Sequence, residues 1–260
     1  MSSPYRRALV TGASSGIGRA IATELAADGV DLVVVARSTD RLSALADELD
    51  VEVEVMTADL LDDTDVRRVV ERLGVDPAID LLVNNAGFGN GGRFDRLDLD
   101  RELAQVQIHI RVMMQLTHAA LTAMRARGGG GGILNVSSMG GFQPMPGSAT
   151  YMACKAYETS FSESIRLENA GSGIHVTALC PGFVDTPMVQ RDAAARRLPR
   201  QLLLSPEGVA RAGIDGVAEN KAVVVPGVGW KAAAALSGAM PRSATRLLLA
   251  GVGRLGRSGS

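Results

Sequence analysis

The sequence predicts a single α/β domain, residues 1–260, built on a doubly wound, mostly parallel sheet. Three observations predict it. Short Val-rich runs alternate with amphipathic helical runs, a Gly-rich turn follows the first run, and polar turn residues follow several later ones. Strand–helix alternation is typical of a parallel sheet covered by helices on both faces. A chain of 260 residues without a linker-like stretch fits one such domain.

Composition excludes several classes of protein. The net charge is −1, which gives no electrostatic reason to expect nucleic-acid binding. Cys154 and Cys180 form neither a disulfide framework nor a metal-binding spacing, so we expect two small buried side chains and no metal. No apolar run is long enough to cross a bilayer, and the N-terminus has no signal-like segment. We therefore expect a cytoplasmic protein.

The first strand, residues 7–10, leads into a Gly-rich turn and a helix over residues 19–27. Glycines let backbone N–H groups approach a pyrophosphate, and a helix N-terminus adds about half a positive charge. The spacing Gly-x-x-x-Gly-x-Gly differs from the commoner Gly-x-Gly-x-x-Gly, so a plain turn is the alternative. The residues predicted to bind phosphate are Gly12, Ser14, Ser15, Gly16, Ile17 and Gly18.

The second strand, residues 31–36, ends at Arg37. Dinucleotide folds that bind NAD carry an acid near this point for the ribose 2′-hydroxyl. An acid would repel a 2′-phosphate, whereas a guanidinium binds it with charge-assisted hydrogen bonds. Arg37 therefore favours NADP(H), with a solvated arginine at a strand end as the alternative.

A helix over residues 40–49, a strand over 51–57 and a helix over 62–73 follow. Asp59 and Leu60 come after that strand, where an adenine could be contacted. The next strand, 81–83, runs into Asn85, Ala86 and Gly87, and ligand crevices lie at such strand ends in open α/β sheets. The loop 88–98 is Gly-rich.

The longest helical stretch is residues 101–127. Its apolar stripe comprises Leu103, Val106, Ile110, Met113, Leu116, Leu121 and Met124. Five glycines, 128–132, predict a flexible connector. The strand 133–136 then delivers Ser137 and Ser138 to the crevice edge.

The helix predicted over residues 151–168 opens with Tyr151, and Lys155 lies one turn further along the same face. Phenols are poor bases at neutral pH, with a reference pKa near ~10, but a neighbouring ammonium favours the phenolate. The pair is typical of proton transfer to a carbonyl or from a hydroxyl. Tyr-x-x-x-Lys alone also occurs by chance in many helices.

The remaining chain completes the alternation with a strand at 175–179, a helix at 206–218 and a strand at 222–225. A rigid turn, 181–187, follows the first of these strands, and residues 188–204 are predicted to form a substrate lid. Residues 228–260 are predicted to form a C-terminal helical extension. Within it, the apolar stripe of 241–257 could contact a membrane surface or a partner, or cover the protein's own pocket.

Five motifs in this order resemble the short-chain dehydrogenase/reductase family, a group of Rossmann-fold oxidoreductases, over residues 7–227. They are TGASSGIG at 11–18, NNAG at 84–87, SS at 137–138, YMACK at 151–155 and PG at 181–182. The resemblance implies that Tyr151 is the general acid or base and that Ser138 hydrogen-bonds the substrate oxygen. Lys155 would hold the nicotinamide ribose and favour the phenolate.

The resemblance also implies a set of NADP(H) contacts. Asn85 and Ala86 would line the adenosine side, and Asp59 the adenine. The turn beginning Pro181-Gly182 would hold the carboxamide through the backbone of Val184 and the hydroxyl of Thr186.

One position departs from the family pattern, because His109 stands where members usually carry an asparagine. That asparagine is thought to hold a water between the lysine and solvent, and a neutral histidine could serve the same relay. We therefore expect the ring near Lys155 across a water, and an asparagine at 109 to keep most activity. The alternative is that His109 simply packs in its helix.

The resemblance implies an oxidoreductase that interconverts a carbonyl and a secondary alcohol with NADP(H). Five side chains near the expected site favour an apolar small molecule or acyl chain as substrate: Met139, Phe142, Met145, Phe183 and Met188. A catalytically idle NADPH-binding sensor or scaffold is the rival. Assembly into a homo-dimer or homo-tetramer through helices 101–127 and 151–168 is expected from the resemblance.

Overall fold

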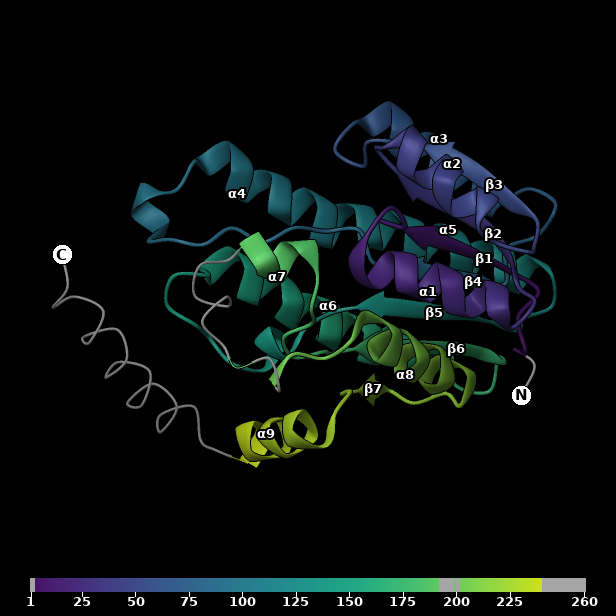
Figure 1. Ribbon diagram of the computed structural model, residues 1–260. Coiled ribbons are helices and arrows are strands. Elements are labelled where there is room, and N and C mark those ends of the chain that lie inside the picture. Colours follow the sequence, from purple (N-terminus) through teal and green to yellow (C-terminus); the bar gives the residue numbers. More distant parts are fainter. Residues whose placement is uncertain (1–2, 192–198, 200–201, 240–260) are drawn as a thin grey trace, which may run out of the picture.

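A computed structural model describes residues 3–191, 199 and 202–239. In this part of the chain seven parallel strands form one sheet in the order β3-β2-β1-β4-β5-β6-β7 (Figure 1). The order reverses between β1 and β4, as in a doubly wound fold, and the predicted fold class is confirmed. The strands are β1 Arg7–Thr11, β2 Asp31–Ala36, β3 Val53–Thr57, β4 Leu81–Asn84, β5 Gly131–Val136, β6 Ile174–Leu179 and β7 Val223–Val224.

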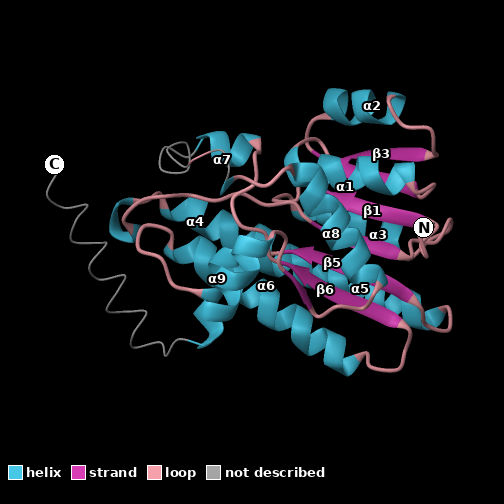
Figure 2. Ribbon diagram, turned by 60° about the horizontal axis from the view of Figure 1, so that its bottom comes forward, coloured by secondary structure: helices cyan, strands magenta, loops and turns pink. Residues whose placement is uncertain are grey.

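Helices cover both faces of the sheet (Figures 1 and 2). One face packs against α1 Gly16–Ala27, α2 Thr39–Asp47 and α8 Pro206–Ala218. The other packs against α3 Asp63–Leu73, α5 Met113–Ala126 and α6 Ala149–Glu168. Successive β1 side chains enter opposite layers, since Ala8 and Val10 join one core and Leu9 the other. The apolar runs read as strands are therefore buried on both sides.

The glycine run was predicted as a connector, but its last two residues belong to β5. A Cβ on Gly131 would lie 2.9 Å from the carbonyl oxygen of Asp80, and one on Gly132 would lie 2.5 Å from the hydroxyl of Tyr5. Close packing therefore requires glycine at these two strand positions.

The long helix divides into α4 Leu99–Val106, a π-helical segment η2 Gln107–Val112, and α5. The predicted stripe is wrong in α4, because Leu103 is 56% exposed whereas Glu102 and Gln105 are buried. Figure 1 shows α4 extending beyond the sheet, so its apolar side chains have no sheet to pack against. The π segment also breaks the 3.6-residue period on which the stripe depended.

The predicted lid begins with α7 Pro187–Arg191, and Leu204 returns to form a bridge with Val184. Most of the residues between them lie outside the described part of the chain. The extension begins as α9 Val228–Ala239, while the stripe at 241–257 lies outside the described residues. Two short helices remain, η1 Phe94–Arg96 and η3 Met139–Phe142. Within the described ranges no helix is long and apolar enough to cross a membrane.

Candidate active site

The Gly-rich loop is held by close backbone packing against the NNAG segment. Gly12 and Gly16 have φ of 68° and 57°, which favour glycine. A Cβ on Gly18 would lie 2.3 Å from Nδ2 of Asn85 and 2.4 Å from the carbonyl oxygen of Gly12. Nδ2 of Asn85 donates to the carbonyl oxygen of Thr11 at 2.8 Å. The side chain of Asn85 thus joins the ends of β1 and β4.

The N-terminus of α1 fits a phosphate group. Ser15 is its N-cap residue, yet the side chain of Ser15 accepts no hydrogen bond from the first turn. Asp62, Asp98 and Ser205 cap α3, α4 and α8 through their side chains, whereas α2 and α6 are uncapped like α1. The uncapped N–H groups and the helix dipole at Ser14, Ser15, Gly16 and Ile17 therefore suit the pyrophosphate of a dinucleotide.

The other predicted cofactor residues lie around this loop. Arg37 follows β2, which pairs with β1, and it is exposed with no hydrogen bond or ion pair to other described residues. Asp59 is half-buried, and its Oδ1 accepts from the N–H of Leu61 at 3.0 Å. Leu60 is buried and lines a small cavity with Thr11 and Ala86.

The turn after β6 meets the same loop. A Cβ on Gly16 would lie 3.2 Å from Cγ2 of Thr186. The Thr186 hydroxyl donates to the carbonyl oxygen of Val184 at 3.3 Å. The structure therefore brings the 181–186 turn and the Gly-rich loop together.

Lys155 is buried one helical turn after Tyr151. Its Nζ donates to the carbonyl oxygen of Val136 at 2.8 Å and to Oε2 of Glu158 at 2.9 Å. The same Nζ lies 5.5 Å from the centroid of the Tyr151 ring. Burial lowers the pKa of Lys155, but Glu158 and Tyr151 raise it more, so the lysine stays an ammonium at neutral pH.

Ser138 stands at the end of β5 and caps η3, where its Oγ accepts from the N–H of Gly140 at 3.0 Å. The preceding Ser137 is buried and donates its hydroxyl to the carbonyl oxygen of Lys155 at 2.9 Å. This contact ties α6 to β5, so Ser138 and Lys155 belong to one rigid unit.

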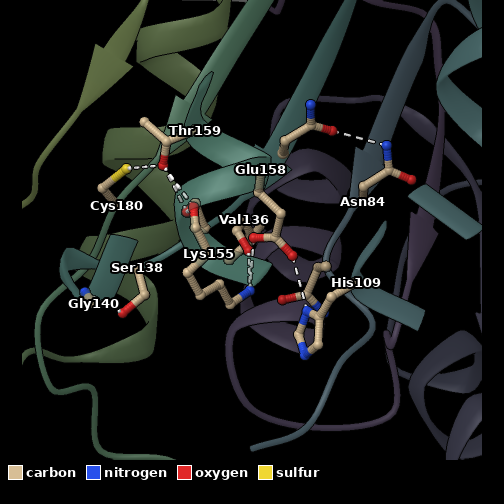
Figure 3. Close-up of polar contacts among 12 residues, drawn as sticks. Asn84, His109, Val136, Ser138, Gly140, Lys155, Glu158, Thr159 and Cys180 are labelled. Carbon is tan, nitrogen blue, oxygen red and sulfur yellow. Dashed lines mark hydrogen bonds and ion pairs between the residues drawn. The ribbon is translucent and has the colours of Figure 1, made fainter. Parts of the chain in front are cut away.

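His109 lies in the π segment and is 2% exposed. Its Nδ1 is 2.9 Å from Oε1 of Glu158, and its Nε2 is 2.8 Å from the carbonyl oxygen of Phe88. The ring meets that of Tyr151 edge-on, with centroids 5.8 Å apart. The Glu158 carboxylate thus contacts both the His109 ring and the Lys155 ammonium, and it lies between them where a water was predicted (Figure 3).

A protein-family model with the description "short chain dehydrogenase" matches residues 6–197, about three quarters of the chain. The protein belongs to the short-chain dehydrogenase/reductase family. A Chromohalobacter salexigens relative named sulfoacetaldehyde reductase 2 is 36% identical over 182 residues, covering 68% of this chain and 72% of its own.

Two solved structures of this family have the same fold. A short-chain dehydrogenase from Sphingobium yanoikuyae in complex with NADPH is 34% identical, with a TM-score of 0.81 over 90% of this chain and 93% of its own. A 3-ketoacyl-(acyl-carrier-protein) reductase from Brucella melitensis complexed with NADH is 29% identical, with a TM-score of 0.77. The match covers 86% of this chain and 96% of the reductase chain.

Sequence reasoning missed two residues that contact the predicted site residues. Glu158 was read only as part of a helix, although an acid three residues after Lys155 was a usable signal. Trp230, the single tryptophan of the chain, was also missed. A Cβ on Gly182 would lie 2.1 Å from its ring, and it meets the Phe183 ring with centroids 5.8 Å apart. The start of the C-terminal extension thus packs on the predicted carboxamide turn.

Proposed function

We propose that the protein is an NADP(H)-dependent oxidoreductase that interconverts a carbonyl and a secondary alcohol on an apolar small molecule or acyl chain. The observation that carries this proposal is the buried Lys155 ammonium 5.5 Å from the Tyr151 ring. A cation held in a dry site beside a phenol stabilises the phenolate that proton transfer requires.

The proposed roles follow from these positions. Tyr151 gives a proton to the substrate oxygen in reduction and takes it back in oxidation. Ser138 donates a hydrogen bond to the same oxygen and orients the substrate. Lys155 favours the phenolate and reaches the ribose hydroxyls. The nicotinamide, when bound, supplies or accepts the hydride.

NADP(H) is proposed over NAD(H) because of Arg37. Arg37 is exposed and follows β2, whose partner β1 leads into the Gly-rich loop, and a guanidinium there suits a 2′-phosphate. The NADPH complex of the Sphingobium relative supports this choice, while the Brucella relative was solved with NADH.

The proposed substrate class and assembly are supported by the names of the relatives and by exposed apolar side chains. The relatives named above reduce an aldehyde or a ketoacyl group by name, which supports carbonyl chemistry. Met145 and Met188, two of the predicted pocket residues, are 48% and 45% exposed. Exposed Leu99, Leu103 and Met114 on α4 and α5 support a homo-oligomer built through these helices.

The test is a screen of carbonyl and alcohol panels with purified protein, following NADPH absorbance. We expect turnover by the wild type and none by Tyr151→Phe, with NADPH affinity within a few-fold because the phenol acts on the substrate. Retained turnover in that variant would remove Tyr151 from the mechanism. NADPH binding without turnover on any panel would favour the sensor.

A further inference from the structure

The pair His109–Glu158 poses a charge problem for the proposed active site. Glu158 is 4% exposed and contacts the Lys155 ammonium at 2.9 Å. If Glu158 were ionised and no other group balanced its charge, it would cancel the positive charge on which the proposed role of Lys155 rests. Its other oxygen meets His109, so the protonation of that contact decides the net charge beside Tyr151.

The hydrogen-bond partners of His109 determine how many protons the pair holds. The Phe88 carbonyl oxygen can only accept, so Nε2 of His109 carries a proton. A proton must also lie between Nδ1 and Oε1 of Glu158, 2.9 Å apart, because otherwise two buried lone pairs would face each other. Imidazolium with carboxylate and imidazole with carboxylic acid both satisfy this condition. Both give the pair a net charge of zero.

We infer that His109 and Glu158 are positioning residues that share one proton, so that Glu158 holds the Lys155 ammonium in place without cancelling its charge. Glu158 accepts from Nζ through Oε2, and the Val136 carbonyl accepts a second Nζ hydrogen. His109 supplies the proton that neutralises Glu158. The cluster keeps the single positive charge of Lys155 next to Tyr151.

Other titratable groups lie around the pair in the described part of the chain. The Tyr151 ring meets His109, Cys154 on α6 and Cys180 after β6 interact with Glu158 and Lys155, and Glu102 on α4 interacts with Cys154. Burial raises the pKa of both thiols to about 11, so both stay neutral at physiological pH. Oε1 of Glu102 accepts from Asn90 and Gln105, at 3.0 Å each.

Two substitutions separate charge from geometry. Asparagine can place an N–H donor where Nδ1 of His109 stands, so His109→Asn keeps the contact to Glu158 but removes the shared proton. Glutamine can accept from Lys155 and donate to Nδ1 of His109, so Glu158→Gln keeps both contacts and a neutral pair. The double variant His109→Asn/Glu158→Gln is neutral again.

The experiment is a tyrosinate absorbance titration of the full-length protein without added cofactor or substrate. The chain has three tyrosines, and the step lost in Tyr151→Phe is assigned to Tyr151. We expect His109→Asn to move this step to higher pH by at least about one unit, because a buried negative charge then opposes the phenolate. Glu158→Gln and the double variant should stay within about 0.3 units of the wild type.

An unshifted His109→Asn, or a double variant that does not return to the wild-type value, would overturn the inference. If His109→Asn does not fold, as judged by circular dichroism, Glu158→Gln tests the inference by itself. A Tyr151 titration step about one pH unit lower in Glu158→Gln than in the wild type would mean that wild-type Glu158 is an uncompensated carboxylate, and would overturn the inference. The inference rests on the proposed roles of Lys155 and Tyr151, but the titration needs no turnover. Absence of wild-type turnover on every carbonyl and alcohol panel would therefore contradict the proposed function. The charge balance at Glu158 would still be tested by the tyrosinate titration.

Discussion

The His109 ring occupies the space that a side chain at position 87 would need. A Cβ on Gly87 would lie 2.3 Å from Cε1 and 2.9 Å from Nε2 of His109. The last residue of the NNAG motif is therefore glycine for a local reason, since it lets the loop after β4 pass directly over the ring. Gly87 thus leaves room for the His109 ring beside Glu158.

Gly87→Ala should push the His109 ring away from Glu158. Overpacking of this kind costs about 1–3 kcal/mol of unfolding free energy, and we expect turnover to fall as well. Urea unfolding and NADPH consumption measure the two effects. Gly91→Ala is the matched control, because the nearest atom to its Cβ, in Gly147, is 3.9 Å away. Equal stability and activity in the two variants would contradict the packing argument.

Lys155→Ala should lose both turnover and cofactor affinity, because the proposed role of the ammonium includes the nicotinamide ribose. The substitution also removes the Nζ donor from Oε2 of Glu158 and from the Val136 carbonyl oxygen, so unfolding free energy should drop by about 1–3 kcal/mol. NADPH titration by fluorescence measures affinity separately from stability. An unchanged dissociation constant would exclude the ribose contact.

Arg37→Asp should reverse cofactor preference towards NADH. The carboxylate accepts from a ribose hydroxyl and repels a 2′-phosphate, and a lost charge-assisted contact is worth roughly 1.5–3 kcal/mol. NADPH affinity should therefore fall at least about tenfold. Lys221→Asp, before β7 at the far edge of the sheet from β3, is the control for the change in net charge. Equal binding of NADH and NADPH by the wild type would show that the assignment is wrong.

Trp230→Ala should widen the substrate range. The indole packs on Gly182 and Phe183, so its removal opens space beside the proposed carboxamide turn. We expect the ratio of kcat/KM for a bulky over a small carbonyl substrate to rise about tenfold or more. Lys231→Ala, an exposed neighbour in α9, should leave the ratio unchanged. A ratio that is the same in both variants would place Trp230 outside substrate selection.

Cys180 should make the protein less stable at alkaline pH. Burial raises the pKa of this thiol to about 11 from the ordinary value of 9.0. Below pH ~9 the thiol is neutral in both the folded and the unfolded protein, and its full contribution to stability is present. Between this pH and the folded pKa, only the thiol of the unfolded protein ionises, which favours unfolding. Unfolding free energy should then fall between about pH 9 and 11, by roughly 2–3 kcal/mol from this group. Urea unfolding should show a smaller pH slope for Cys180→Ala, and an equal slope would contradict the assignment.

The sequence by itself determined the fold and the order of the motifs. Strand and helix periods are local properties, so alternating Val-rich runs and amphipathic segments predicted the parallel sheet that the structure has. The Gly-rich turn was equally readable, because the positive φ of Gly12 and Gly16 is a requirement of single residues. The i, i+4 spacing likewise predicted that Lys155 follows Tyr151 on one face of α6.

Only the tertiary structure decided which side chains meet across these elements. The π segment in the long helix turns His109 towards Glu158, a residue 49 positions away, and no local period encodes that contact. Trp230 reaches Gly182 through the path of α9, and the sequence predicted a helical extension there without showing what it would pack against. Burial then changes the chemistry, since an acid that would be a solvated helix residue becomes a neutralised partner of Lys155 once His109 packs against it.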